Sequence, residues 1–211
     1  NIFRAVNIAM VNELKLVFDR MGVNIWEVID AAKTKPFGFM PFYPGPGMGG
    51  HCIPIDPFYL SWKAKEFNTE AKFIELAGEI NRKMTENIAH RVGKALNDDK
   101  KSIRESKILI IGLAYKKDID DIRESPAIKI MDLLKYKGAK IDYHDPFVNE
   151  FRNLRSIDLT TKNIQKYDSL IITTDHSEID YEMIGKHASL VVDTRNIMSS
   201  VKKPKSRIVM A

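Results

Sequence analysis

Cysteine is nearly missing from this sequence, since its 211 residues include only Cys52. A single cysteine excludes an internal disulfide and a cysteine-rich zinc site, and it is typical of proteins in a reducing cytoplasm. The five histidines show no metal-ligand spacing, so we predict no metal site. The sequence also lacks any run of about 18 apolar residues, which argues against a membrane-spanning segment.

Neither positive nor negative charge is concentrated in one segment of the sequence. The net charge of +5 and the isoelectric point near 9.1 suit an anionic ligand. Because the lysines are scattered rather than arranged in a stripe, we expect no nucleic-acid partner. No signal peptide is recognisable, and the sequence begins at Asn1 inside a helical pattern. We therefore expect a cytoplasmic protein that is a piece of a longer chain.

The first half of the sequence has the apolar spacing of helices. Gly22 is expected to end the first helix and Asn24 to cap the second. Residues 34–58 hold most of the prolines, which predicts a loop, and the charged residues 97–101 predict a linker. The helical patterns cover residues 3–21, 24–32, 60–67 and 69–96.

After residue 101 the pattern changes to short apolar runs that alternate with helical or polar spacers. Ser125 and Pro126 are typical of a helix start, and Gly138 is expected to close that helix. Such alternation predicts an α/β fold, with an all-α domain over residues 1–100 and a Rossmann-like, doubly wound parallel sheet over residues 101–211. The expected strands are residues 107–111, 140–143, 169–173, 190–192 and 207–210.

The segment from Tyr43 to Cys52 combines two prolines, four glycines and the lone thiol. Glycine lets a ligand approach the backbone closely, and proline stiffens a loop. Asp56 adds an acid four residues after the thiol. The combination is typical of a loop that presents a nucleophile, whereas most lone cysteines are small buried hydrophobic residues. The residues alone leave both interpretations of Cys52 open.

A second cluster of charged residues covers residues 112–125, between the first expected strand and the helix after it. Ligands of open α/β sheets bind at the carboxyl ends of strands, and a helix start offers free N–H groups to an anion. Lys116 and Arg123 would add positive charge to such an anion site. The alternative is a solvated loop whose charges pair with one another. The dinucleotide fingerprint G-x-G-x-x-G is absent from this segment, so we expect no complete NAD site on this domain.

Two further residues end expected strands on the same rim of the sheet. Asp145 stands where a ribose-binding acid would lie in a Rossmann domain, but it also fits an ordinary strand-ending turn. Arg195 follows a later strand and is either a ligand-binding residue or an ordinary surface residue. The sequence does not decide between these alternatives.

A set of motifs is distributed over the whole length of the sequence. They are Asn1, Arg4, Asn7, Ala9, Asn12, Glu13, the segment Pro44–Cys52, Asp56, Pro57, Asn81, residues 112–125, Tyr143, Asp145, Pro146 and residues 193–196. Together they resemble the UDP-glucose/GDP-mannose dehydrogenase family. Residues 34–39 and 51–60 look most like its UDP-N-acetylglucosamine 6-dehydrogenase branch. UDP-glucose or UDP-N-acetylmannosamine as substrate, and a non-catalytic nucleotide-sugar binding module, are the alternatives.

The resemblance implies a four-electron oxidation of the C6 alcohol of a UDP-sugar to a carboxylate, with two NAD as cofactor. Cys52 would attack the C6 aldehyde to form a thiohemiacetal, and oxidation would give a thioester that water hydrolyses. Asp56 would orient or activate water, and the Asn1 amide would bind the oxyanion. The product would feed surface-polysaccharide biosynthesis.

The resemblance also implies binding residues. Lys116 and Arg195 would contact the UDP-sugar, and the carboxyl-terminal domain would hold the uridine diphosphate. Arg123 would reach the NAD pyrophosphate. The glycines expected to lie against the sugar nucleotide are Gly45, Gly47, Gly49 and Gly50.

Finally, the resemblance implies missing parts and a partner. The family's NAD-binding first domain is not in this sequence, and its catalytic lysine would fall about four residues before Asn1. We therefore predict that the 211 residues alone produce no NADH. The family forms a homodimer through its long central helices. The apolar faces of residues 3–21 and 69–96 permit this homodimer or a simple intramolecular core.

Overall fold

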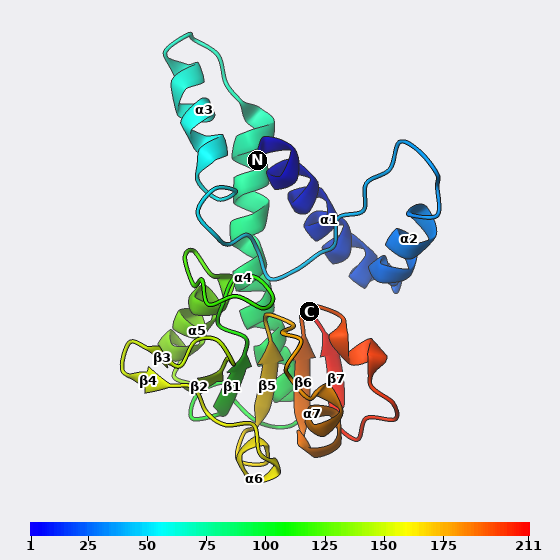
Figure 1. The fold of residues 1–211 in the computed structure, drawn as a ribbon, viewed down its shortest axis with the longest axis vertical. Coiled ribbons are helices and arrows are strands. Elements are labelled where there is room, and N and C mark those ends of the chain that lie inside the picture. Colours follow the sequence, from blue (N-terminus) through cyan, green and yellow to red (C-terminus); the bar gives the residue numbers. More distant parts are fainter.

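The computed structural model describes all residues from Asn1 to Ala211. Its first half consists of helices α1 (Ile2–Met21), α2 (Ile25–Ala32), α3 (Asp56–Lys65) and α4 (Lys72–Asp98) (Figure 1). The predicted boundaries of the first two helices are confirmed. Gly22 ends α1 with φ of 71°, and the Asn24 side chain accepts a hydrogen bond from the Trp26 N–H at the start of α2. None of the helices is both long and apolar enough to cross a membrane.

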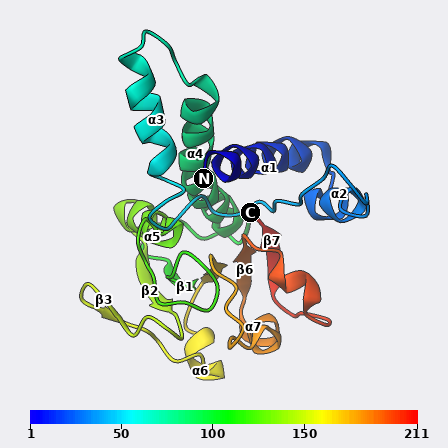
Figure 2. The ribbon, with the colours of Figure 1, turned by 45° about the horizontal axis from the view of Figure 1, so that its top comes forward.

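The boundaries of the other two helices differ from the prediction. Helix α3 begins at Asp56, inside the segment expected to be a loop, because an acid followed by proline is a favourable first turn. Helix α4 begins at Lys72 rather than at residue 69 and continues through Asp98, so the first two residues of the expected linker over 97–101 belong to it. Helix α2 and the loop after it project away from the other helices (Figure 2).

The second half is built on a five-stranded sheet that confirms the predicted α/β fold. All neighbouring strands are parallel, in the order β2-β1-β5-β6-β7. Ser125 caps α5 (Pro126–Tyr136), as predicted. The strands are β1 (Lys107–Ile111), β2 (Lys140–His144), β5 (Ser169–Ile172), β6 (Leu190–Asp193) and β7 (Arg207–Met210).

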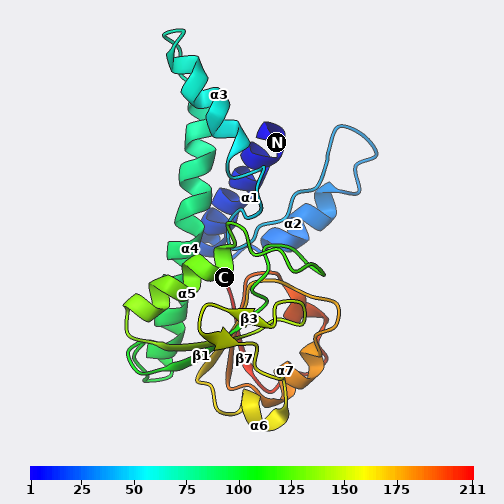
Figure 3. The ribbon, with the colours of Figure 1, turned by 60° about the vertical axis from the view of Figure 1, so that its left-hand side comes forward.

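Helices cover both faces of this sheet (Figure 3). One core contains α5 and the second half of α4, packed against Ile108 and Ile110 of β1. The other core contains Leu109 and Ile111 of the same strand and residues of the opposite helices. The remaining elements are β3 (Glu150–Phe151), β4 (Leu154–Arg155), α6 (Thr161–Ile164), α7 (Tyr181–His187) and a 3-10 helix (Ile197–Ser200).

Helix α4 belongs to both halves of the molecule. Its first part lies against α1 and α3, and it then runs down along the sheet (Figures 1 and 3). Ile88, Val92 and Leu96 are almost fully buried in the same core as β1. The sheet is therefore covered on one face by a helix that precedes residue 100, where we predicted the domain boundary. The division into units over 1–100 and 101–211 stays a prediction.

The turn after β1 gives a testable prediction about stability. Gly112 has φ of +85°, and a Cβ there would lie 2.5 Å from the carbonyl oxygen of Thr174. Gly22 has a similar φ of +71° but no neighbouring atom within 4 Å. Backbone strain is thus similar at the two sites, and only Gly112→Ala adds a clash with backbone. We expect Gly112→Ala to cost about 2 kcal/mol more than Gly22→Ala in urea unfolding. Equal costs would contradict this account.

Candidate active site

Cys52 lies exposed on the loop between α2 and α3. Its interpretation as a small buried hydrophobic residue is therefore wrong. The carbonyl of Cys52 accepts hydrogen bonds from the N–H groups of Ile55 at 3.2 Å and Asp56 at 2.8 Å, so the loop passes directly into the first turn of α3. This turn fixes the backbone of the thiol while leaving its side chain accessible.

The two other predicted catalytic residues meet beside this turn. The Asn1 amide donates a hydrogen bond of 2.6 Å to a carboxylate oxygen of Asp56, although 55 residues separate them. Asn1 precedes α1 and Asp56 begins α3, so two helix starts bring them together. The amide donor and the carboxylate acceptor are therefore hydrogen-bonded to each other, and the acceptor lies four residues after Cys52 in the sequence. Their catalytic roles stay predictions.

The loop that carries Cys52 is tied to both halves of the protein. At its start, the N–H of Gly45 donates to the side chain of Asn12 on α1 at 2.9 Å. Near its end, the N–H of Gly50 donates to the carbonyl of Arg123 at 2.8 Å. The segment between these tethers is consequently held where the helices meet the rim of the sheet.

The glycines of this loop are explained by their neighbours. A Cβ at Gly45 would lie 2.9 Å from Arg195 Nη1, and one at Gly49 would lie 2.4 Å from the Cβ of Tyr115. Gly47 and Gly50 have positive φ, of +134° and +85°. The absence of side chains thus lets the loop pack against the rim. Their contact with a sugar nucleotide stays a prediction.

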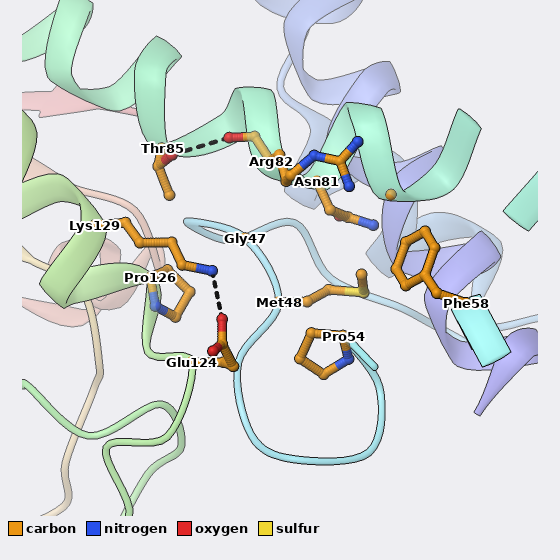
Figure 4. Close-up of a pocket in the computed structure, with 11 residues that line it drawn as sticks. Gly47, Met48, Pro54, Phe58, Asn81, Arg82, Thr85, Glu124, Pro126 and Lys129 are labelled. Atoms are coloured by element: carbon orange, nitrogen blue, oxygen red, sulfur yellow. Dashed lines mark hydrogen bonds and ion pairs between the residues drawn. The ribbon is translucent and has the colours of Figure 1, made fainter. Parts of the chain in front are cut away.

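A cavity of about 160 Å³ lies behind this loop (Figure 4). In the figure, Gly47 and Met48 of the loop face Arg82 and Asn81 of α4, and the Lys129–Glu124 ion pair of 2.8 Å lies to one side. Of the predicted site residues only Gly47 lines it. The cavity therefore lies behind the loop, and Cys52 does not line it. The lining residues are Gly47, Met48, Pro54, Phe58, Gly78, Asn81, Arg82, Thr85, Glu124, Pro126 and Lys129.

The charged loop after β1 carries two exposed lysines, Lys116 and Lys117, and one paired arginine, Arg123. Lys116 is exposed and makes no hydrogen bond or ion pair through its amine. Arg123 instead donates to the carboxylate of Asp121, at 2.7 Å from Nη2 and 3.0 Å from Nε. This pairing raises the pKa of Arg123, and smaller electrostatic contributions from Tyr115 and Cys52 act in the same direction.

Arg195 is not an ordinary surface residue. Its Nε donates to the carbonyl of Thr173 at 2.8 Å, and its side chain is 26% exposed. Burial lowers the pKa of Arg195, and the nearby carboxylates of Asp175 and Asp193 oppose this shift. Arginine stays charged at neutral pH, so the rim holds a fixed positive charge against Gly45.

Asp145 lies in the strand-ending turn that was one of its two interpretations, because it accepts the N–H of Phe147 at 2.8 Å, and it also bonds to residues of other strand ends. Its side chain is fully buried, so the carboxylate does not face a ligand. The buried ring of His176 accepts the Asp118 N–H at Nδ1, so its Nε2–H donates to Asp145 at 3.1 Å. The backbone N–H groups that also donate to Asp145 belong to Leu113, Ala114, Phe147 and Val148.

This arrangement tests whether the sheet could hold a dinucleotide in the usual Rossmann manner. That manner uses the acid at the end of the second strand to bind a ribose hydroxyl. Both oxygens of Asp145 are occupied by protein donors, so the residues at this strand end do not fit that role. Arg123 is the remaining candidate for contact with an NAD pyrophosphate. Its side chain is exposed and is paired with Asp121.

Sequence reasoning gave no role to four residues that shape this site: Asn12, Asn81, Tyr115 and His176. Asn12 carried a signal, because it interrupts the apolar face of the first helix. His176 carried none, since it is 31 residues from its partner Asp145. The structure holds no group of three or more His, Cys, Asp or Glu side chains placed to share a metal ion.

Two family profiles match this chain. The profile of the UDP-glucose/GDP-mannose dehydrogenase family, central domain, matches residues 1–83. The profile of the UDP binding domain of the same family matches residues 109–200. The two matches fall on the helical half and on the sheet, and they leave out the second half of α4.

Individual proteins are similar over nearly the whole chain. UDP-N-acetyl-D-mannosamine dehydrogenase of Methanococcus vannielii is 35% identical over 94% of this chain and 46% of its own length. UDP-N-acetyl-D-glucosamine 6-dehydrogenase of Pseudomonas aeruginosa is 30% identical over 96% of this chain and 50% of its own. The solved structure of UDP-D-ManNAc dehydrogenase from Pyrococcus horikoshii superposes with a TM-score of 0.86 at 34% identity, over 100% of this chain and 49% of that one. This chain spans about half the length of the curated relatives it matches.

Proposed function

Because this chain belongs to the UDP-glucose/GDP-mannose dehydrogenase family, we propose that it forms the central and UDP-binding parts of an NAD-dependent UDP-sugar 6-dehydrogenase. The observation that carries the proposal is the exposed thiol of Cys52, on a loop tied to both halves of the protein, beside the Asn1–Asp56 contact. A loop with a purely structural role would not require an accessible thiol at position 52.

Cys52 would act as the covalent nucleophile. Its thiolate forms an S–C bond to the C6 aldehyde, and the carbonyl oxygen takes a proton to give a thiohemiacetal. Loss of hydride from C6 and of the hydroxyl proton converts this species to a thioester. Water then adds to the thioester carbon, the S–C bond breaks, and the carboxylate leaves. NAD supplies the hydride acceptor in both oxidations. The covalent bond keeps the reactive aldehyde on the protein throughout.

Asn1 and Asp56 would support the steps at Cys52. The Asn1 amide can donate to the oxygen that becomes negatively charged when the thiolate attacks. Asp56 can accept a proton from the hydrolytic water, and its contact with Asn1 orients both groups before substrate binds. These roles need donor and acceptor close together, and the contact of 2.6 Å provides this.

The rim of the sheet would hold the UDP part of the substrate. Lys116 is unpaired and exposed, and Arg195 is oriented by the Thr173 carbonyl. Both lie on loops at the carboxyl ends of parallel strands, where α/β sheets bind ligands. A diphosphate is the kind of anion that a lysine and an oriented guanidinium recognise. Arg123 would contact the NAD pyrophosphate once its bond to Asp121 is exchanged.

The substrate is proposed to be a UDP-N-acetylhexosamine. Residues 34–39 and 51–60 led us to predict UDP-N-acetylglucosamine, and the P. aeruginosa relative carries that name at 30% identity. UDP-N-acetylmannosamine is the second candidate, because the M. vannielii relative has the higher identity of 35%. We further propose a cytoplasmic enzyme whose uronate product is used in polysaccharide biosynthesis.

A substrate panel tests this proposal. NADH formation by the full-length protein is measured with UDP-N-acetylglucosamine, UDP-N-acetylmannosamine, UDP-N-acetylgalactosamine and UDP-glucose. Preference for one of the first two supports the proposal, and oxidation of UDP-glucose alone would overturn the choice of substrate. The 211 residues alone, which span about half of the relatives, are expected to give no NADH with any of them. NADH formation by this chain would contradict that expectation.

We also propose a homodimer through the central helices. Large apolar side chains are exposed on α1 and on α4, among them Phe3, Met10, Phe73 and Leu76. Exposed apolar faces of this kind favour burial against a second copy. Light scattering of the chain is expected to give twice the mass of 24.1 kDa. A monomer mass would contradict the proposal.

A further inference from the structure

Two buried asparagines lie beneath the start of the cysteine loop. Asn12 is fully buried and Asn81 is 3% exposed. The Asn12 amide donates to the Asn81 carbonyl oxygen at 2.8 Å, and Asn81 in turn donates to the backbone carbonyls of Ala77 at 2.9 Å and Ala5 at 3.3 Å. The remaining oxygen, on Asn12, accepts the N–H of Gly45 at 2.9 Å. Each amide of the pair is thus paired through both its oxygen and its nitrogen, and together they join α1, α4 and the loop.

Gly45 also lies close to Arg195. A Cβ on this glycine would lie 2.9 Å from Arg195 Nη1. Arg195 cannot retreat freely, because its Nε is bound to the carbonyl of Thr173 at 2.8 Å. Gly45 is therefore hydrogen-bonded to an amide of the helical half and lies next to a guanidinium of the sheet.

We propose that Asn12 and Asn81 are positioning residues that hold Gly45 against Arg195. A change in the position of Arg195, which follows β6, would then change the conformation of the loop that carries Cys52, and the reverse. The inference deepens the proposed function and rests on it, since it couples the residue that would bind the diphosphate to the residue that would attack the sugar. Neither asparagine touches substrate in this scheme. Both act through Gly45.

The energetics favour a positioning role over mere packing. A buried amide pair is costly to desolvate, and an apolar pair of similar volume would fill the same space between two helices. The pair offers what apolar side chains cannot, namely a fixed acceptor for the N–H of Gly45. The second tether, from Gly50 to the Arg123 carbonyl, holds the other end of the loop. Loss of the first tether should therefore change the loop without unfolding it.

The single cysteine makes this testable. The rate of Cys52 alkylation by iodoacetamide is measured in the 211-residue chain, at fixed pH and well below the lowest melting temperature. Asn12→Leu is expected to raise the rate about threefold or more. Asn87→Leu is the matched control, because Asn87 lies on α4 but bonds only to the carbonyl of Lys83. Leu134→Ala, which weakens the core under the sheet, controls for lowered stability alone. Both controls are expected to stay within about 1.5-fold of wild type.

A double-mutant cycle tests the coupling. In an Arg195→Ala background, Asn12→Leu is expected to change the alkylation rate by less than about 1.5-fold. Effects that multiply independently, or an unchanged rate in Asn12→Leu itself, would overturn the proposal. If Asn12→Leu does not fold, Gly45→Ala replaces it, since it leaves the amide pair intact and pushes on Arg195. UDP is titrated separately by calorimetry. Absence of UDP binding would count against the proposed function, whereas the cycle needs no UDP.

Discussion

Cys52→Ser in the full-length enzyme is expected to lower NADH formation by on the order of 10³-fold or more, with UDP-sugar binding retained. The exchange replaces sulfur by oxygen on an exposed side chain, so it removes the nucleophile and leaves the loop contacts of Gly45 and Gly50 in place. A serine hydroxyl is a much weaker nucleophile than a thiolate unless a neighbouring base activates it. The expected loss therefore lies in kcat rather than in substrate affinity.

Steady-state kinetics and calorimetric titration with UDP-sugar provide the two measurements. Unchanged turnover would refute Cys52 as the nucleophile and favour the alternative of a non-catalytic nucleotide-sugar binding module. Loss of turnover together with loss of binding would instead show that the thiol supports the loop. The exposed position of Cys52 makes this second outcome the less expected of the two.

The sheet was predictable because its signals are local. Buried parallel strands are continuous apolar runs, as in β1, and the caps at Asn24 and Ser125 follow from one or two side chains. The start of α3 was predicted too late because the proline and glycine composition of the loop masked the favourable Asp56-Pro57 start. The hairpin of β3 and β4 was missed since strands of two residues show no alternation.

The site was predictable in part for a different reason. Cys52, Asp56 and Asn1 were found through motifs, and their meeting beside the first turn of α3 depends on how α1 and α3 pack. The Asn12–Asn81 bond spans 69 residues and the His176–Asp145 bond spans 31. Asn12 could be noticed as a polar residue on an apolar helix face, but the choice of partner in each pair depends on tertiary packing and follows from no local pattern.

These long-range pairs have a common property, which is that polar side chains are buried where loops must keep one shape. A buried polar network is worthwhile only if each member is paired, and it then specifies a single arrangement more strongly than apolar packing does. Asn12 and Asn81 fix the loop of the thiol, whereas Asp145 and His176 fix the loop of Lys116. The second network contains a charge, so its disruption should cost more.

Asp145→Asn is expected to destabilise the protein by about 3–5 kcal/mol, the usual cost of removing one partner from a buried charged network. An asparagine would place an NH₂ group against N–H donors that the carboxylate now accepts, and His176 would lose its charged partner. Asp132→Asn is the control, because Asp132 pairs with Arg152 on the surface, where such a pair is worth less than about 1 kcal/mol. Urea unfolding followed by circular dichroism measures both. Similar losses in the two variants would contradict a structural role for Asp145.

The effect of Asp145→Asn should depend on pH in a defined direction. Burial raises the pKa of the Asp145 carboxyl, but hydrogen bonds from His176 and from backbone N–H groups outweigh it, so the pKa in the folded protein is lowered. A carboxyl with a lowered pKa contributes stability that is fully present above its unfolded value, near 4, and is lost as the pH falls through the folded value. The difference in unfolding free energy between wild type and Asp145→Asn is therefore expected to be largest above about pH 5 and to shrink as the solution is acidified. A difference that stays constant or grows on acidification would mean that the carboxylate form is not what holds this loop.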